Sequence, residues 1–180
     1  MKIMFASDIH GALPCCEKMI GRYFEEKAEK LILLGDILYH GPRNDIPDGY
    51  DPKGVSALLN KHKSELLCVR GNCDAEVDQM MLEFPVLAEY MIMWLGGRMV
   101  FATHGHVHNT SAPPMLKSGD ILLHGHTHIQ TAEEHDGYVY INPGSVSLPK
   151  NGNKNSYMVF QDDTFTIKSL DGTSLIQYKI

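Results

Sequence analysis

The sequence has no long apolar run, no excess of basic residues and few cysteines, and each of these absences excludes a class of protein. None of its stretches reaches the length that crosses a membrane, and the apolar run near its start is too short for a signal peptide. A net charge of −6 is unlike the basic surface that binds long nucleic acids. The 4 cysteines include no CxxC pair and lack the spacing of a secreted disulfide scaffold. We therefore expect a cytoplasmic protein with reduced thiols, with neither a membrane nor a long nucleic acid as partner.

Length and composition favour one globular domain. The 180 residues, 43% of them hydrophobic, suffice to bury a substantial core, so we expect a single domain over 1–180. In the first half, apolar strands alternate with helices, which is the pattern of βαβ units with parallel strands. We expect these strands at 2–6, 31–34 and 66–69, and the helices at 13–27, 55–63 and 76–84. The second half is dominated by antiparallel strands, beginning with a hairpin of 86–95 and 98–103 around Gly96-Gly97.

Polar side chains follow the first two predicted strands. Asp8 and His10 come after the first strand, and Asp36 after the second. The carboxyl ends of parallel strands share one edge of a sheet, where open α/β folds place ligands. In extended geometry residues two apart share a side, so we expect Asp8 and His10 to face one site. Capping of the next helix would explain Asp8 but not the histidine beside it. Two carboxylates brought together repel each other, and a divalent cation removes that conflict.

A histidine-rich segment follows the apolar run 121–123. If strand geometry persists beyond this run, His126 and His128 point the same way and each can reach a different ion of a paired site. Gly125 leaves room for a close approach of the backbone. The alternative is a solvated loop that happens to be rich in histidine.

Two further segments carry candidate groups. The third strand ends in Asn72-Cys73-Asp74, where the Asn72 carbonyl suits a hard or borderline cation, although the three residues would also make an ordinary turn. The segment 39–52 is long for a structureless connection, and Arg43 is its only fixed cation. Arginine can grip a phosphate with two hydrogen bonds, whereas the alternative is a solvated surface side chain.

In order along the chain, the five strand ends read D-x-H, G-D, G-N-x-D, H-G-H and G-H-T-H. Each motif is weak alone, but the five in this order resemble the calcineurin-like metallophosphoesterase superfamily, from Met1 to about Ser147. The segments 40–44 and 142–145 look most like those of a group of small bacterial phosphodiesterases. The resemblance implies a four-layer α/β/β/α sandwich of two mixed sheets flanked by helices, with a two-metal site at one edge of the sheets.

The resemblance also implies two divalent metal ions, each held by three side chains and bridged by a seventh. The ligands would be Asp8, His10 and His128 for one ion, Asn72, His104 and His126 for the other, and Asp36 as the bridge. Such ligands suit Mn, Fe, Zn or Ni, and we expect Mn²⁺ first. Two ions roughly 3.5–4 Å apart can hold a hydroxide and a phosphate oxygen together. The implied activity is hydrolysis of small phosphodiesters by attack of a metal-bridging hydroxide, with no covalent role for Cys73 or Ser145.

One position departs from the family pattern. A histidine commonly follows the asparagine, and it is usually credited with contacting phosphate or protonating the leaving oxygen; here Cys73 stands in its place. A thiol is at best a weak donor. The neighbouring Asp74 is retained and could orient other groups. The substitution favours small phosphodiesters over phosphoproteins as substrates.

Two other functions fit the same motifs. The first is a nuclease or a phosphomonoesterase on the same metal centre, and the acidic composition weighs against long nucleic acids as its substrate. The second is a non-catalytic scaffold, because a retromer coat subunit shares this fold with a compromised metal site. The full set of ligand types favours catalysis. The sequence leaves a homo-oligomer, dimer or tetramer, open.

Overall fold

The computed structural model describes residues 1–180 and begins with the expected βαβ unit. It comprises β1 (Ile3–Ala6), α1 (Leu13–Glu26) and β2 (Lys30–Leu33). β1 and β2 pair in parallel, as predicted. Side chains alternate across β1, since Met4 and Ala6 pack towards the helices and Ile3 and Phe5 towards the second sheet. The first strand is therefore buried on both faces.

The first sheet has six strands in the order β11-β10-β9-β1-β2-β3. β3 (Leu66–Cys68) extends the parallel part. The C-terminal strands join on the other side and are antiparallel; they are β9 (Ser156–Gln161), β10 (Thr164–Ser169) and β11 (Ser174–Lys179). The sheet is thus mixed, and its parallel strands come from the alternating half of the sequence.

The second sheet has five strands in the order β4-β5-β6-β8-β7. Its strands are β4 (Tyr90–Leu95), β5 (Arg98–Thr103), β6 (Ile121–His124), β7 (Gln130–His135) and β8 (Tyr138–Pro143). β5, β6 and β8 are parallel, whereas β4 and β7 are antiparallel edge strands. This sheet is also mixed, so the expected pair of mixed sheets is confirmed.

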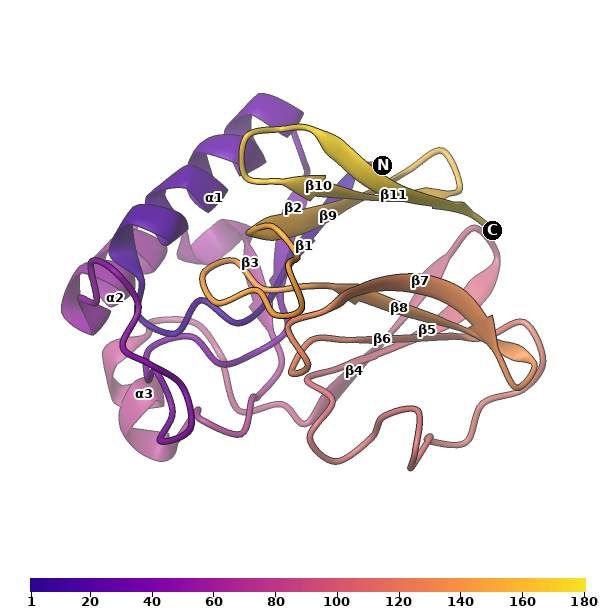
Figure 1. Ribbon diagram of the computed structural model, residues 1–180, viewed down its shortest axis with the longest axis horizontal. Coiled ribbons are helices and arrows are strands. Elements are labelled where there is room, and N and C mark those ends of the chain that lie inside the picture. Colours follow the sequence, from indigo (N-terminus) through magenta and orange to yellow (C-terminus); the bar gives the residue numbers. More distant parts are fainter.

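Two hydrophobic cores hold the layers together. One lies between the sheets and includes Phe5, Val100 and Phe165. The other lies between the six-stranded sheet and the helices, which include α2 (Pro52–Asn60), a 3₁₀ turn (Lys63–Glu65) and α3 (Glu76–Met81). All three α-helices lie on one side of the molecule, with both chain termini on the opposite side (Figure 1).

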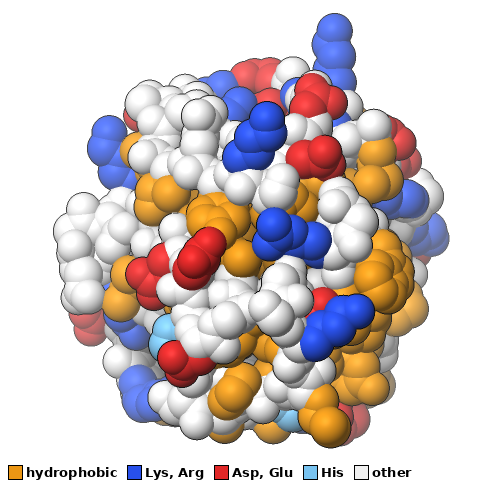
Figure 2. Space-filling model, turned by 90° about the vertical axis from the view of Figure 1, so that its right-hand side faces the viewer, with side chains coloured by type: hydrophobic (Ala, Val, Ile, Leu, Met, Phe, Trp, Pro, Cys, Tyr) orange, Lys and Arg blue, Asp and Glu red, His pale blue; other side chains and the backbone are white.

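In this chain a loop takes the place of helices on the outer face of the five-stranded sheet. There Phe101, Leu122 and Tyr140 form a small buried cluster against Leu116, which lies in the connection between β5 and β6. That connection contains Pro113-Pro114 and has no helical apolar period. On the side seen in Figure 2, hydrophobic side chains reach the surface between charges of both signs. No α-helix has the length and apolar content that a membrane crossing requires.

Several element boundaries differ from the sequence expectation. The helices predicted to end at residues 63 and 84 end at Asn60 and Met81, and two other shifts have a cause in side-chain hydrogen bonds. α2 begins earlier than residue 55, because the Asp51 carboxylate accepts a hydrogen bond from the Gly54 N–H at 2.9 Å and caps the helix. The strand expected over 86–95 begins only at Tyr90, because the Val86 N–H donates to Gln79 Oε1 rather than to a neighbouring strand. Both shifts come from side-chain hydrogen bonds that hydrophobic periodicity does not report.

Candidate metal centre

The side chains of Asp8, His10 and His128 meet beyond the ends of β1 and β6. Their donor atoms all lie within 4.8 Å of one another. His128 Nε2 is 3.1 Å and His10 Nε2 3.5 Å from the same oxygen, Asp8 Oδ1. All three residues are buried. Their convergence matches the group predicted from the resemblance.

A second group forms beyond β2, β5 and β6. Asp36, His104 and His126 also place their donor atoms within 4.8 Å of one another. His104 Nε2 lies 3.4 Å from Asp36 Oδ2 and 3.1 Å from His126 Nδ1. The carbonyl oxygen of Asn72 is 3.1 Å from the same His104 nitrogen. All seven predicted ligands thus gather at one edge of the two sheets.

Asp36 connects the two groups. The oxygen that faces His104, Oδ2, also lies 3.7 Å from His10 Nε2. The structure further groups Asp36 and His10 with Cys73 within the same 4.8 Å limit. One carboxylate oxygen therefore stands between two sets of ligands, which is the position that a bridging ligand requires.

Backbone carbonyls fix the orientation of three of the histidines. Nδ1 of His10 lies 2.8 Å from the Tyr39 carbonyl, and Nδ1 of His104 lies 2.7 Å from that of Leu34. Nδ1 of His128 makes the same contact at 2.6 Å with Leu148. When Nδ1–H donates to the carbonyl, neutral imidazole presents the lone pair of Nε2 to the cluster, as in metal sites. His126 differs, since its Nδ1 faces the cluster.

An unsatisfied oxygen shows that this donor set fits a cation. Asp8 Oδ1 is buried and has no hydrogen-bond donor. Its neighbours, His10 and His128, turn Nε2 lone pairs towards it when their Nδ1 atoms carry the protons. A carboxylate oxygen and imidazole nitrogens converging without N–H groups between them need a positive charge. Oxygen and nitrogen ligands of this kind suit divalent transition metals.

The pKa shifts within the cluster also show that positive charge stabilises it. Burial alone would raise the pKa of Asp8, but contacts with His10 and His128 outweigh it and lower that pKa well below its usual value. Burial opposes the protonation of His104, yet Asp36 and Asp8 raise its pKa to about 9. Burial and the charge of His104 lower the pKa of His126 to about 4. Against the effect of burial, the contact with Asp8 also raises the pKa of His10, so without metal protonated histidines supply positive charge to the cluster. A metal ligand must lose such a proton.

Left-handed backbone, rather than extended strand, brings these side chains together. The expectation that Asp8 and His10, and likewise His126 and His128, share a side in extended geometry is wrong. Their φ angles are 60°, 50°, 64° and 62°, and that of Asp36 is 55°. β6 ends at His124, whose ring lies 4.6 Å from that of Tyr140 in a tilted arrangement. The strands stop before the site, and tight turns aim the side chains.

Gly125 allows the histidine segment to approach β1 closely, as predicted. A Cβ atom there would lie 1.9 Å from Ser7 Oγ and 2.6 Å from Asp8 Oδ2. The next residue, His126, donates its backbone N–H to Asp8 Oδ2 at 3.0 Å. The glycine therefore joins the two ligand segments, and the solvated-loop alternative does not describe this segment.

Asp74 holds the Asp36 turn in place. Its carboxylate accepts hydrogen bonds from the backbone N–H groups of Asp36, Ile37 and Gly71 at 2.8, 2.9 and 2.7 Å. The residue is buried and does not line the cavity over the cluster. Asp74 is thus a positioning residue for the Asp36 turn.

The helix-cap alternative for Asp8 does not hold, because Ala12 is the N-cap of α1.

A polar cavity of about 340 Å³ opens over the cluster. Arg43 and Cys73 line it, as the sequence suggested, and Arg43 forms no ion pair. Burial and the Asp36 carboxylate raise the pKa of the Cys73 thiol, which therefore stays protonated at neutral pH. The cavity thus combines a free cation with metal-ligating side chains, an arrangement suited to an anion.

Sequence reasoning missed two kinds of contributor. Lys150 supplies a second cation to the cavity, but it belongs to no motif. Ser145 and Ser147 donate hydrogen bonds to the Asp8 carbonyl at 2.8 and 3.0 Å, and the Asn142 amide donates to the Gly125 carbonyl at 2.8 Å. In the sequence, the segment 142–145 stands out only through its resemblance to small bacterial phosphodiesterases, which does not predict these hydrogen bonds. Ser145 is committed to Asp8, so its hydroxyl has a structural role.

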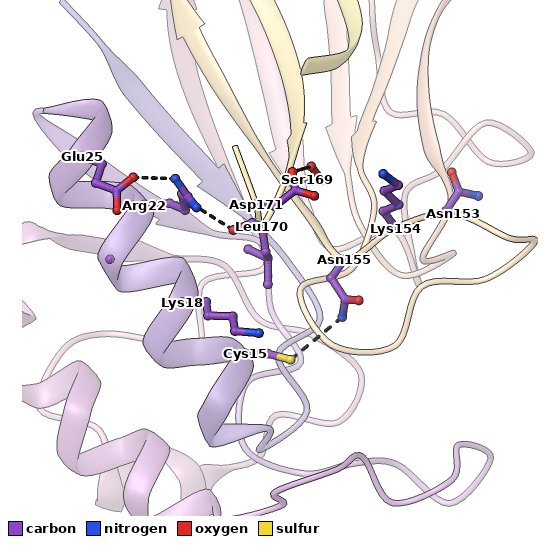
Figure 3. A pocket seen from close by; sticks show the side chains of 11 residues that line it. Cys15, Lys18, Arg22, Glu25, Asn153, Lys154, Asn155, Ser169, Leu170 and Asp171 are labelled. Carbon is purple, nitrogen blue, oxygen red and sulfur yellow. Dashed lines mark hydrogen bonds and ion pairs between the residues drawn. The ribbon is translucent and has the colours of Figure 1, made fainter. Parts of the chain in front are cut away.

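A larger cavity, of about 700 Å³, lies away from the cluster, between α1 and residues 153–155 (Figure 3). It is lined mainly by polar and charged side chains. Arg22 reaches across it to the Leu170 carbonyl at 2.9 Å and pairs with Glu25. None of the seven candidate ligands lines this cavity. The size of a cavity therefore does not identify the functional site here, whereas the ligand cluster does.

Comparisons with known proteins agree with this geometry. The family model for the calcineurin-like phosphoesterase superfamily domain matches residues 1–164. Phosphodiesterase YfcE of Escherichia coli K12 is 44% identical over 176 residues, which are 98% of this chain and 96% of YfcE. A solved structure of E. coli YfcE, described as a phosphoesterase, superposes with a TM-score of 0.96 over 100% of both chains.

More distant relatives share the fold with lower identity. Phosphodiesterase MJ0936 of Methanocaldococcus jannaschii is 28% identical over 156 residues, covering 80% of this chain and 83% of MJ0936. The structure of Vps29 from Entamoeba histolytica has a TM-score of 0.60 at 21% identity, covering 100% of this chain and 99% of Vps29. At that identity, the likeness to Vps29 concerns the fold alone.

Proposed function

The chain belongs to the calcineurin-like phosphoesterase superfamily and is a metal-dependent phosphoric diester hydrolase, and we propose that it uses two metal ions to hydrolyse small phosphodiesters. The observation that carries the proposal is the position of Asp36. Its Oδ2 atom lies 3.7 Å from His10 and 3.4 Å from His104, which belong to different ligand groups. A single-metal site would not need a carboxylate shared between two groups.

The proposed ligands divide as the two groups do. Each ion takes three side chains in addition to the shared Asp36; the sets are Asp8, His10 and His128, and Asn72, His104 and His126. When bound, two divalent ions supply a nucleophile from water near neutral pH and offset charge on the phosphoryl group. The donor set of imidazole, carboxylate and amide suits Mn²⁺, with Zn²⁺, Fe or Ni²⁺ as alternatives.

The residues of the chain orient and bind the substrate. Arg43 and Lys150 line the cavity and place two positive charges near a bound phosphodiester anion. The volume of about 340 Å³ suits a phosphate with small ester groups rather than a long nucleic acid. The protonated Cys73 thiol is a weak donor beside the reacting phosphate and does not act as nucleophile.

The test combines metal analysis with turnover. Protein purified without chelator is expected to contain two divalent ions per chain and, with Mn²⁺, to hydrolyse bis(p-nitrophenyl) phosphate faster than p-nitrophenyl phosphate. Removal of the metal with EDTA should abolish turnover, and Mn²⁺ should restore it. One ion per chain at full activity would contradict the binuclear centre. Metal-loaded protein without turnover on any phosphate ester would favour the scaffold alternative.

A further inference from the structure

A second cavity, of about 400 Å³, adjoins the metal cluster on its Cys73 side. It lies between the connection that follows β2 and helix α3. Seven of its 10 lining residues are hydrophobic, whereas only one of the 11 residues around the polar cavity is. Cys73 lines both cavities. A substrate with its phosphate at the cluster can therefore reach apolar surface past the thiol.

The walls of this apolar cavity expose large hydrophobic side chains. Leu38 is buried in it, whereas Tyr39, Val77 and Met81 are 42%, 62% and 44% exposed. Apolar side chains around a hollow lose contact with water when an apolar group enters, and this favours binding. The exposed fractions show that the side chains remain available to such a group.

The same connection that forms a wall also holds a metal ligand. The backbone carbonyl of Tyr39 accepts the hydrogen bond from His10 Nδ1 at 2.8 Å. Opposite, α3 begins directly after the turn of Cys73 and Asp74, which is fixed to Asp36. Both walls are therefore tied to the ligand cluster, so the apolar cavity keeps its place relative to the phosphate site.

The polar residues at the rim of the apolar cavity do not prevent an apolar group from binding there. The Asp78 carboxylate accepts a hydrogen bond from the Ala75 N–H at 2.7 Å within the first turn of α3. Lys53, also part of the lining, forms no ion pair. The Asp78 carboxylate is thus held by the helix backbone, and the one cation among the lining residues, Lys53, is compatible with an anionic phosphodiester.

We propose that this apolar cavity binds one ester group of the substrate, and that the group is an aromatic or other apolar one. The proposal rests on the proposed function and specifies its substrate class, namely phosphodiesters that carry at least one aromatic or apolar alcohol. The polar cavity then receives the phosphate, and the second ester group faces solvent. Val77 and Met81 are the specificity-determining residues.

The experiment compares two ligands that differ only in this group. Phenyl phosphate and methyl phosphate carry the same dianionic phosphate and a single ester group, so calorimetry on Mn²⁺-loaded protein isolates the contribution of the ring. Transfer of a phenyl group from water to apolar surface makes phenyl phosphate the tighter ligand by about tenfold or more. Because calorimetry reports binding rather than product formation, inactivity of the enzyme and failure of the apolar cavity give different results.

Variants of α3 provide the matched comparison. Met81→Gln is nearly isosteric and Val77→Asn is neutral, and both make the cavity polar at partly exposed positions where the fold tolerates change. Each should reduce the preference for phenyl over methyl phosphate by about threefold to tenfold while leaving the affinity for methyl phosphate unchanged. Met80→Gln is the control, since Met80 lies on the same helix, is 85% exposed and does not line the cavity.

Two results would overturn the proposal. The first is equal affinity of wild type for phenyl and methyl phosphate, or a preference that both cavity variants retain. The second comes from sedimentation analysis of wild type and Met81→Gln. If the variant alone falls to a smaller species, the cavity is occupied by a second copy of the chain and is not open to substrate. An unchanged sedimentation coefficient together with the lost preference supports the assignment.

Discussion

Replacing Cys73 by histidine tests how much the missing imidazole limits the reaction. The structure fixes where the new side chain begins, because the Cys73 N–H donates to Asp36 Oδ1 at 2.8 Å. The Cβ direction is therefore unchanged by the substitution. Cavities of about 340 and 400 Å³ meet at this residue and give an imidazole room. On the side of Gly41 there is none, since a Cβ on Gly41 would already lie 3.0 Å from the sulfur.

The expected gain depends on the leaving group. A general acid typically contributes about 10²–10⁴-fold, and a donor that only contacts phosphate contributes less. Alkyl and nucleoside leaving groups have high pKa values and need a proton, so Cys73→His should raise their kcat/KM by about 10²-fold. Aryl groups such as p-nitrophenolate depart without protonation and should gain little. The assay is kcat/KM for aryl and nucleoside phosphodiesters at saturating Mn²⁺.

The control is Cys73→Ser, which should remain near wild type. Burial and the Asp36 carboxylate raise the pKa of the thiol, so sulfur supplies neither a nucleophile nor a strong acid. A Ser variant without activity or with less bound metal would show that the thiol acts in the site, as its grouping with His10 and Asp36 allows. A His variant that gains nothing on any nucleoside ester would refute the reasoning about leaving-group protonation.

Substitutions at three further residues test other parts of the account. Asp36→Asn should abolish hydrolysis and lower metal content by at least one ion per chain, because a neutral amide cannot balance two dications; two bound ions with near-normal turnover would exclude the bridging role. Arg43→Ala should raise KM for phosphodiesters with metal content unchanged, and Arg43→Lys should recover part of the loss; identical kinetics in all three proteins would make Arg43 a solvated loop residue. Burial opposes ionisation of Glu26, but Lys168 at 2.7 Å and its other partners lower its pKa below the usual 4.5. The carboxylate therefore stabilises the fold above that value, and the contribution disappears as the pH falls through the lowered pKa. Glu26→Gln should cost about 1 kcal/mol at pH 7 by denaturant unfolding and nothing in strong acid; a difference independent of pH would contradict this assignment.

The sequence predicted which residues form the site better than it predicted the backbone geometry that places them. Parallel strands must present their carboxyl ends at one edge, so apolar runs followed by Asp8, Asp36 or Asn72 were sufficient to place these residues near one another. The shape of the turns is set by backbone contacts between segments far apart in sequence. Examples are the Asp8 N–H donating to the Gly35 carbonyl at 3.1 Å and the His10 N–H donating to that of Asp36 at 2.9 Å. Periodicity carries no information about such contacts.

The sequence did not predict the second cation of the site or the apolar cavity, because both depend on tertiary packing. Lys150 reaches the polar cavity because its segment bonds to the histidine turn, with the Lys150 N–H donating to the His128 carbonyl at 3.1 Å. The apolar cavity arises where the connection after β2 faces α3, and neither the polar connection 39–52 nor this short helix has an apolar pattern that predicts it. In contrast, Gly125 could be assigned from sequence, because close approach is a requirement that only glycine meets.

The left-handed turns explain why an extended-strand argument found the correct residues by an incorrect route. Ten non-glycine residues have positive φ, and five of them are proposed ligands: Asp8, His10, Asp36, His126 and His128. Each such conformation costs about 1–2 kcal/mol, although Asp and His adopt it more readily than most residues. Cross-turn hydrogen bonds between the β1 and β2 segments offset that cost. Side chains two apart still converge, because the backbone of each turn folds back on itself instead of continuing straight. The ligand geometry therefore forms when the chain folds, without metal. The favourable free energy of folding offsets the strain of these turns.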